Sequence, residues 1–220
     1  MLPGGNLAPD LLVCADGGAA TAVSLGLRPD IVIGDGDSLD PRLGHELAAS
    51  GIPVELVAAD KDESDLQLCV EYAAREDARE ILVVGAFGGD RLEHTLANLL
   101  LLDHPSLDGR SVALTDGRST VRLIGHRLGS SEEGPEPGEL VIEGQPGDWV
   151  SLFALDAEVL DVTTEGLRFP LMAEPLRRGP ARGLSNELLE TRARVRCGRG
   201  RLLVVHTRRT VPQGENGGSR

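Results

Sequence analysis

Three short apolar runs in the first half of the chain each end in a glycine-containing turn, and this recurring pattern constrains the fold most. The runs cover residues 11–15, 30–33 and 81–84, and the turns begin at Asp16, Gly34 and Gly85. Uninterrupted apolar runs of this length are typical of strands buried in a parallel sheet, and helical segments follow them. The first half is therefore predicted to be a Rossmann-like α/β domain, with helices on both faces of a parallel sheet.

The second half has a different pattern, in which turn signals separate most of a series of short β-type runs. Such runs are typical of a small all-β domain, a sandwich or a barrel. The predicted strands cover residues 139–142, 150–154, 159–163, 167–171, 192–196 and 202–207. Two earlier strands are predicted at 111–114 and 120–124, and the pattern leaves open whether the first still belongs to the parallel sheet.

The expected boundaries follow from local composition. Residues 129–138 are rich in Ser, Glu, Gly and Pro, which favours a loop or linker. We therefore expect an α/β domain over residues 1–128 and a β-rich domain over residues 129–207. The polar residues 208–220 are expected to form a disordered tail.

Composition excludes several classes of partner. With 22 Lys and Arg against 35 Asp and Glu, the net charge of −13 argues against nucleic acid or an anionic membrane as a partner. No apolar run of the sequence approaches the ~18 residues of a membrane span. The three cysteines are far apart and form no C-x-x-C motif, which indicates neither a zinc site nor a disulfide framework. We expect reduced thiols in a cytoplasmic protein.

Two carboxylates follow the second apolar run directly. Asp35 and Asp37 lie where an open α/β sheet binds its ligands, beyond the carboxyl end of a strand. Two neighbouring carboxylates repel each other, and a divalent cation such as Mg²⁺ or Mn²⁺ removes that repulsion. Taken alone, a D-x-D sequence is more often a polar loop with an Asx turn.

A second acidic segment surrounds Lys61, the only lysine of the chain. It reads Asp60-Lys61-Asp62-Glu63-Ser64-Asp65 and is predicted to open a helix that runs to about Glu76, with Asp62 as its N-cap. Helix capping and favourable placement near the helix dipole explain one or two of these carboxylates. Three of them around one lysine are not readily explained by these two effects.

The third glycine turn leads into a helix with two expected faces. Arg91, His94 and Asn98 fall on one polar line, which we expect to face a ligand because it follows a turn at the carboxyl end of a strand. The alternative is an ordinary solvated face. The opposite side is predicted to pack through Leu92, Leu96, Leu99 and Leu100.

In this order, the segments resemble the thiamine pyrophosphokinase family. The matching segments are ADGGA at 15–19, GDGDS at 34–38, KDESD at 61–65, GGDRLEHTLAN at 88–98, GDWVSL at 147–152, TTEGL at 163–167 and SNE at 185–187. The resemblance implies an α/β domain that binds ATP and Mg²⁺, followed by a thiamine-binding β domain. It also implies a homodimer with a shared active site, and transfer of the pyrophosphoryl group of ATP to thiamine.

The resemblance implies roles for individual residues. Asp35, Asp37 and Asp62 are expected to hold the metal, with Asp65 and Lys61 as further catalytic residues. Asp65 is expected to hold a ligand or to orient the thiamine hydroxyl, and Lys61 and Arg91 to offset phosphate charge. The residues expected at the nucleotide are Asp16, Gly17, Gly18, Gly88, Gly89, Arg91, Glu93, His94 and Asn98. Ser185 and Asn186 are expected to hold thiamine.

The sequence departs from the family pattern at a few positions. Gly36 replaces a bulky apolar residue, Ser64 replaces Thr and Glu93 replaces Asp. The family usually has one more strand before residues 15–19, whereas here only ten residues precede Leu11. Two alternatives remain open at this point: a pyrophosphokinase acting on 6-hydroxymethyl-dihydropterin, and a non-catalytic sensor that binds nucleotide or thiamine.

Overall fold

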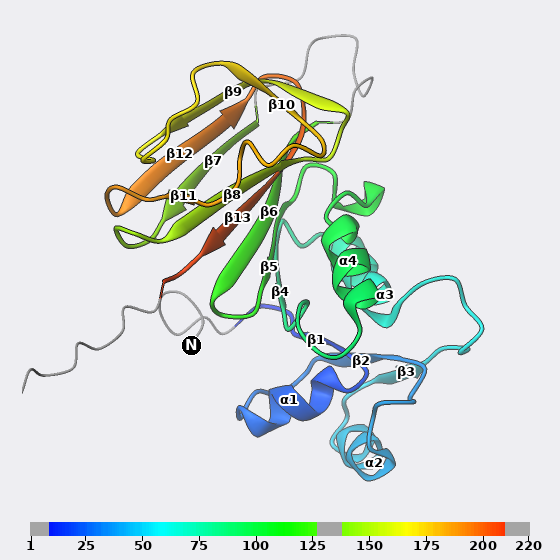
Figure 1. Cartoon of the computed structure of the whole chain (residues 1–220). Helices are drawn as coiled ribbons and strands as arrows, with labels where there is room; N and C mark the ends of the chain where they lie inside the picture. Colours follow the sequence, from blue (N-terminus) through cyan, green and yellow to red (C-terminus); the bar gives the residue numbers. More distant parts are fainter. Residues whose placement is uncertain (1–8, 127–137, 210–220) are drawn as a thin grey trace, which may run out of the picture. The chain divides into compact units, whose positions relative to one another are not determined.

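The computed structural model describes residues 9–126 and 138–209, and its chain divides into two compact units, Met1–Val112 and Ala113–Arg220. In Figure 1 the first unit is coloured from blue to green and the second from green to red. The division falls earlier than the boundary expected after residue 128, because the strands at 111–115 and 119–126 pair with each other in an antiparallel sheet. Most of the expected linker and nearly all of the expected tail lie outside the described residues.

The first unit contains a parallel sheet of three strands in the order β1-β2-β3. These are β1 (Val13–Ala15), β2 (Ile31–Gly34) and β3 (Val54–Leu56), with Cys14 opposite Val32 and Val32 opposite Val54. All four residues of β2, the central strand, are buried. The predicted parallel sheet is therefore confirmed for the apolar runs at 11–15 and 30–33. The run at 81–84 also forms a strand, but it lies outside this sheet and only Val83 is buried, so its prediction as a buried strand of the parallel sheet is wrong.

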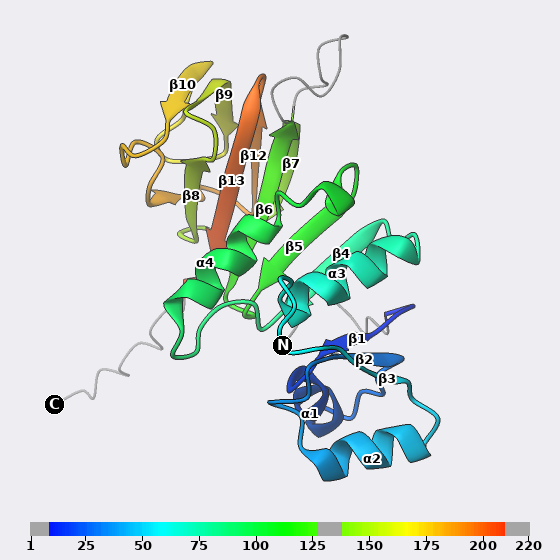
Figure 2. The same ribbon diagram turned by 90° about the vertical axis from the view of Figure 1, so that its right-hand side faces the viewer.

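Helices cover both faces of this sheet (Figure 2). Alternate strand residues point to opposite faces, so Cys14 and Val32 pack with α1 (Gly18–Ser24) and α2 (Pro41–Ala49) through Ala19, Ala22 and Leu47. Ile31 and Ile33 pack instead against Cys69 of α3 (Asp65–Arg75). The prediction of helices on both faces is confirmed.

Helix α3 begins later than predicted. Its N-cap is Ser64, whose hydroxyl accepts a hydrogen bond from the backbone N–H of Gln67 at 3.2 Å. The prediction of Asp62 as the N-cap is wrong, because Ser64 already satisfies the first turn and leaves Asp62 in the bend before the helix. Asp65 consequently becomes the first helical residue.

The predicted leucine face of the next helix is wrong in part. Strand β4 (Glu80–Val84) leads through the glycine turn to α4 (Leu92–Leu101), which is followed by the 3₁₀ turn η1 (Pro105–Leu107). Leu92, Leu96 and Leu100 are 70%, 53% and 59% exposed. The inward side of α4 carries Asn98 and the half-buried Leu99, because the Asn98 side chain bonds to the preceding turn.

The second unit is a sandwich of two antiparallel sheets. One sheet has the order β10-β9-β12-β7, and strands of the other follow the order β11-β8-β13-β6-β5. Their bounds are β5 (Ser111–Thr115), β6 (Ser119–His126), β7 (Gly138–Glu143), β8 (Trp149–Ala154), β9 (Glu158–Glu165), β10 (Glu174–Arg177), β11 (Asn186–Glu187), β12 (Arg192–Cys197) and β13 (Gly200–Thr207). The core between the sheets includes Val150, Val162, Val195 and Leu202. The predicted β-rich domain is confirmed.

One predicted strand of this unit, at residues 167–171, does not form. Only an isolated bridge joins Leu167 to Leu188 there, and Pro170 has no N–H to continue a ladder.

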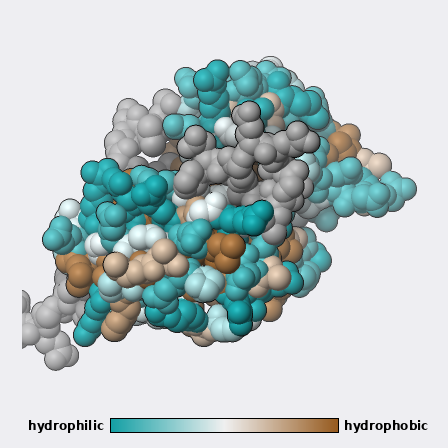
Figure 3. Space-filling view, turned by 90° about the horizontal axis from the view of Figure 1, so that it is seen from above, coloured by the Kyte–Doolittle hydropathy of each residue, from teal (hydrophilic) through white to brown (hydrophobic). Residues whose placement is uncertain are grey.

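The surface seen in Figure 3 is mostly hydrophilic, with small separated apolar areas. Within the described residues, no helix combines the length and the apolar character needed to cross a bilayer.

Candidate metal centre

Asp16, at the end of β1, is held in an unusual backbone conformation by its neighbours. Its φ of 39° lies in the left-handed region, its N–H donates to the carbonyl of Ile33 at 3.0 Å, and its own carbonyl accepts from the N–H of Ala19 at 3.0 Å. Strain of this kind gathers at functional sites. A Cβ atom at Gly34 would lie 2.7 Å from the Cβ of Asp16, so only glycine permits this approach.

Three carboxylates from separate elements converge in this unit. Asp16 follows β1, Asp35 follows β2 and Asp65 opens α3, and one oxygen of each lies within 4.8 Å of the others. The topology explains the convergence, because the carboxyl ends of the parallel strands meet at the same edge of the sheet. This arrangement of oxygen donors fits a hard divalent cation.

One carboxylate oxygen of Asp16 has no hydrogen-bond partner among the described protein atoms. The residue is only 4% exposed, and burial is the main reason that its pKa is raised, with Asp37 and Asp65 adding to the effect. Its Oδ2 accepts from the N–H of Ser38 at 2.7 Å, which opposes the rise. Its Oδ1 is buried and has no hydrogen-bond partner. A cation held by the three carboxylates would satisfy this oxygen.

Lys61 supplies one positive charge beside the cluster. Its Nζ lies 2.8 Å from Oδ1 of Asp65, one helical turn further along, and this contact raises the pKa of Lys61. The ammonium therefore stays charged, and it offsets part of the negative charge of the three carboxylates. Its place in the sequence, before the first turn of α3, keeps it at the same helix end as Asp65.

Asp37 lies beside the cluster and Asp62 does not join it. The Ser38 hydroxyl donates to Oδ1 of Asp37 at 2.7 Å, which is the main cause of a lowered pKa of Asp37, and Asp16 and Asp35 contribute to the same shift. The Asx turn expected as an alternative is also present, because the N–H of Asp37 donates to Oδ1 of Asp35 at 3.1 Å. Asp62 is exposed and outside the group of converging carboxylates.

Of the three expected metal ligands, only Asp35 belongs to the group of converging carboxylates, whereas Asp37 lies beside it and Asp62 outside it. Asp16 was expected at the nucleotide, but the structure places it with Asp35 and Asp65, while the expected ligand Asp62 stays apart. The overlooked signal was positional, since Asp16 follows the carboxyl end of β1 just as Asp35 follows that of β2.

The glycine turns have the open backbone that close approach of a ligand requires. Gly17 is the N-cap of α1, and a Cβ at Gly18 would meet no heavy atom within 4 Å. Gly85, Gly88 and Gly89 have φ values of 79°, 91° and 76°, which favour glycine. Such turns at strand ends suit phosphate groups, which backbone N–H groups bind.

Asn98 is structural support for this second turn. Its Nδ2 donates to the carbonyl of Ala86 at 2.8 Å, which ties α4 to the turn before it. Arg91 and Glu93 are both exposed and form an ion pair of 2.7 Å, which is the main cause of a lowered pKa of Glu93. His94 is exposed as well. Of the three residues on the expected polar line, Asn98 thus holds the turn, whereas the side chains of Arg91 and His94 are exposed.

The two residues expected at thiamine differ in what their side chains can do. The amide of Asn186 donates to the carbonyl of Phe169 at 2.7 Å and accepts from its N–H at 3.0 Å, so it fixes the backbone of Phe169. Ser185 is exposed, has a left-handed φ of 59° and donates its N–H to the Ser151 hydroxyl at 3.0 Å. Its own hydroxyl is therefore better placed than the Asn186 amide to meet a ligand.

Comparison with known proteins gives two family matches. Residues 7–114 match the thiamin pyrophosphokinase catalytic domain, and residues 139–202 match the thiamin pyrophosphokinase vitamin B1 binding domain. The first match includes all three converging carboxylates, and the second includes Ser185 and Asn186.

Individual relatives agree with these matches along most of the chain. Thiamine pyrophosphokinase 1 of Oryza sativa subsp. japonica is 30% identical over 211 residues, which cover 84% of this chain and 74% of the rice protein. Thiamine pyrophosphokinase of Bacillus subtilis is 24% identical over 212 residues, covering 92% and 94%. The crystal structure of thiamine pyrophosphokinase from Bacillus subtilis superposes with a TM-score of 0.77 at 24% identity, covering 91% of this chain and 88% of the other.

Proposed function

Because the chain belongs to the thiamine pyrophosphokinase family, we infer that it transfers the pyrophosphoryl group of ATP to the hydroxyl of thiamine, giving thiamine diphosphate and AMP. The observation that carries this proposal is the convergence of Asp16, Asp35 and Asp65 within the residues that match the catalytic domain. Phosphoryl-type transfer depends on alignment and charge neutralisation more than on covalent chemistry by the protein.

We propose Mg²⁺ as the cation of this centre, with Mn²⁺ as a substitute. Asp16, Asp35 and Asp65 would hold it, and Asp37 would contribute from beside the cluster, directly or through water. The buried Oδ1 of Asp16, which has no protein partner, supports this assignment. When bound, the cation offsets the negative charge of the transferred phosphates and helps to orient them.

The side chains around the centre would position the triphosphate and the acceptor. Lys61 would offset phosphate charge while keeping Asp65 in place through their 2.8 Å contact. The N–H groups near Gly17 and Gly88-Gly89 would bind phosphate oxygens. Arg91 would exchange its exposed ion pair with Glu93 for a phosphate, since an exposed pair contributes little.

Thiamine would bind to the β-rich unit. Ser185 would donate or accept a hydrogen bond directly, and Asn186 would act through the Phe169 backbone that it holds.

We further propose a homodimer with a shared active site and a cytoplasmic location. The three free, buried cysteines support a reducing compartment.

One pair of variants tests the metal centre. Asp65→Asn removes a converging carboxylate, and Asp62→Asn changes an exposed carboxylate three residues away outside the group. With ATP, Mg²⁺ and thiamine, we expect Asp65→Asn to lower AMP and thiamine diphosphate formation about 100-fold or more. Asp62→Asn should stay within about twofold of the unchanged protein, and circular dichroism should confirm that both variants are folded.

The same assay separates the alternatives. Full turnover by Asp65→Asn, or loss of turnover by Asp62→Asn, would remove the assignment of the metal ligands. Replacing thiamine by 6-hydroxymethyl-dihydropterin tests the other pyrophosphokinase activity, and turnover of the pterin alone would overturn the proposed function. Binding of ATP and thiamine without any AMP would instead indicate a sensor.

A further inference from the structure

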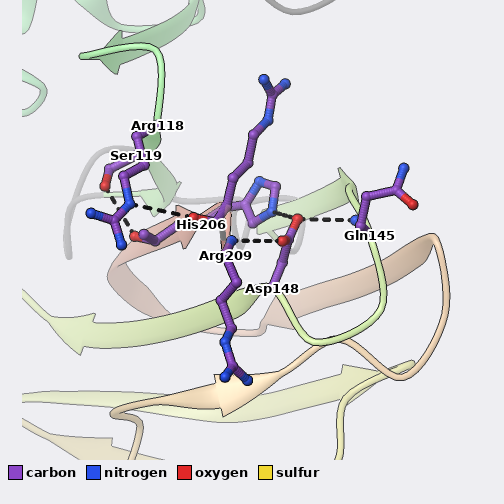
Figure 4. Close-up of polar contacts among 8 residues, drawn as sticks. Arg118, Ser119, Gln145, Asp148, His206 and Arg209 are labelled. Carbon is purple, nitrogen blue, oxygen red and sulfur yellow. Dashed lines mark hydrogen bonds and ion pairs between the residues drawn. The ribbon is translucent and has the colours of Figure 1, made fainter. Parts of the chain in front are cut away.

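Asp148, in the turn before β8, joins three parts of the second unit (Figure 4). It is only 2% exposed, and its Oδ2 accepts from the N–H of Gln145 and contacts Nε2 of His206, both at 2.9 Å. Its Oδ1 accepts from the N–H of Arg209 at 2.9 Å. A buried carboxylate with three partners fixes their relative positions firmly. The backbone of Arg209, just beyond β13, is thereby anchored beside β8.

The side chain of Arg209 extends from this anchor over the only tryptophan of the chain. Its guanidinium carbon lies 5.1 Å from the centroid of the Trp149 ring, a cation–π distance. Its Nη1 lies 3.8 Å from Oε1 of Glu187, the residue directly opposite Trp149 in the ladder of β8 and β11. Glu187 also pairs with Arg168 at 3.1 Å, so Arg209 shares this carboxylate.

Arg209 thus combines a firmly held backbone with a weakly held side chain. The guanidinium-bearing side chain is 47% exposed, and an exposed cation–π contact with a long, shared ion pair is easily given up. Trp149 is 38% exposed, which is a large apolar and aromatic surface in a chain with few aromatic residues. The indole face is therefore available to another cation or aromatic ring once the guanidinium leaves it.

The surroundings of Trp149 indicate which ligand would compete. Trp149 lies within residues 139–202, which match the vitamin B1 binding domain, whereas Arg209 lies beyond them. Thiamine has an aminopyrimidine ring and a permanently cationic thiazolium ring, and an indole face attracts such groups just as it attracts a guanidinium. Two cations do not share one face of a ring, so one must leave.

We propose that Arg209 is an internal competitor for the indole face of Trp149, which it covers in the free protein and yields to thiamine. The proposal rests on the proposed function, because it takes thiamine as the ligand. Arg209 then sets the affinity for thiamine without contacting the reacting atoms. Its removal should favour binding, since the competing contact and the repulsion between like charges are both lost.

Fluorescence of Trp149 tests this directly, because no other tryptophan contributes. Thiamine is titrated into the unchanged protein, Arg209→Ala, Arg209→Lys and Arg208→Ala. Arg208 is the matched control, since it is the adjacent exposed arginine and its removal changes the net charge equally. We expect Arg209→Ala to bind thiamine about two- to fivefold more tightly, with Arg209→Lys and Arg208→Ala near the unchanged protein.

The emission spectra add a signature that a purely structural role would not produce. Without thiamine, Arg209→Ala should differ in emission from the unchanged protein, and at saturating thiamine the two spectra should coincide because Arg209 has left the ring. Equal or weaker affinity in Arg209→Ala, or spectra that still differ at saturation, would overturn the proposal.

Turnover measured in parallel separates this proposal from the proposed function. Thiamine turnover without any change in Trp149 emission would overturn the role of Arg209 and leave the function intact. Absence of both turnover and binding in the unchanged protein would overturn both.

Discussion

The position of the Asp16 carboxylate depends on Gly34, because glycine has no Cβ atom to collide with Asp16. Asp16 lies at a left-handed φ against the end of β2, and a methyl group at Gly34 would approach its Cβ to 2.7 Å and its Cα to 3.2 Å. The backbone atoms on both sides belong to hydrogen-bonded strands, so neither residue can move freely. One of the proposed metal ligands is thus placed by the sequence of a neighbouring strand.

We therefore expect Gly34→Ala to destabilise the first unit by about 1–3 kcal/mol, the usual cost of overpacking, and to lower turnover by displacing Asp16. Gly18→Ala is the matched control for stability, because Gly18 opens α1 and a methyl group there meets no heavy atom within 4 Å. Urea unfolding followed by helical circular dichroism measures both. Similar stability for Gly34→Ala and Gly18→Ala would show that the contact is not restrictive.

Asp148 is expected to make stability depend on pH. Burial would raise its pKa, but hydrogen bonds from the N–H groups of Gln145 and Arg209 and from His206 outweigh burial, and the pKa is lowered from its ordinary value of 3.8. A carboxylate with a lowered folded pKa stabilises the fold above its unfolded pKa. That contribution is lost as the pH falls through the folded value.

Asp148→Asn should consequently lose about 3 kcal/mol of stability at neutral pH, where the buried charge and its partners are intact. The difference from the unchanged protein should shrink as the pH falls below about 4. Urea unfolding followed by Trp149 fluorescence at a series of pH values checks this. A difference that stays constant down to the lowest pH would show that the charge of Asp148 is not responsible.

At the scale of elements, Arg110 holds the end of α3 whose start carries Asp65. Its Nη1 donates to the carbonyl of Ala78 at 2.8 Å, its Nη2 to that of Ala74 at 2.9 Å and its Nε to that of Ser106 at 3.1 Å. Carbonyls at a helix C-terminus lack intrahelical partners, and a cation there also complements the helix dipole.

We expect Arg110→Ala to destabilise the first unit by about 1–3 kcal/mol, because three carbonyls lose a charged donor. Arg110→Lys should recover only part of this loss, since an ammonium keeps the charge but not the planar fork. Hydrogen exchange of the last turn of α3, with urea unfolding, measures both effects. Full recovery by lysine would show that charge alone, and not the forked geometry, holds the helix end.

Element prediction succeeded where one physical signal dominated and failed where two competed. The apolar runs at 11–15 and 30–33 could be assigned because burial of a parallel strand leaves no polar position. The start of α3 could not, because Asp62 and Ser64 are both good N-caps and only the fold selects Ser64. The run at 167–171 was apolar enough for a strand, yet Pro170 breaks the ladder.

The residues of the candidate site could likewise be predicted only where a local sequence pattern indicates them. The acidic segments indicated Asp35 and Asp65, because clustered carboxylates at strand and helix ends are chemically distinctive. For Asp16, the sequence indicated only a place beside a glycine turn. Its convergence with Asp35 and Asp65 depends on which strands are neighbours in the sheet. The Asp148 network joins residues 58 or more positions apart at His206 and Arg209, which no local pattern reveals.

At the scale of the whole molecule, the two units carry separate spectroscopic signals. The α-helices of the described residues, α1 to α4, all belong to the first unit, and the single tryptophan, Trp149, belongs to the second. Each unit also has hydrophobic clusters of its own. Helical circular dichroism therefore reports the unit with the candidate metal centre, and tryptophan fluorescence reports the unit with the proposed thiamine surface.

We expect Mg²⁺ to stabilise the first unit selectively. A cation that binds only the folded centre adds about 2.7 kcal/mol at a concentration 100 times its dissociation constant. The urea midpoint followed by helical circular dichroism should rise with Mg²⁺ and not with NaCl of equal ionic strength, because general screening of the net charge of −13 affects both salts alike. The midpoint followed by Trp149 should change less, and Asp65→Asn should abolish the selective rise. If the rise persists in Asp65→Asn, the cation binds elsewhere; if both probes shift equally, the units unfold together despite their separate cores.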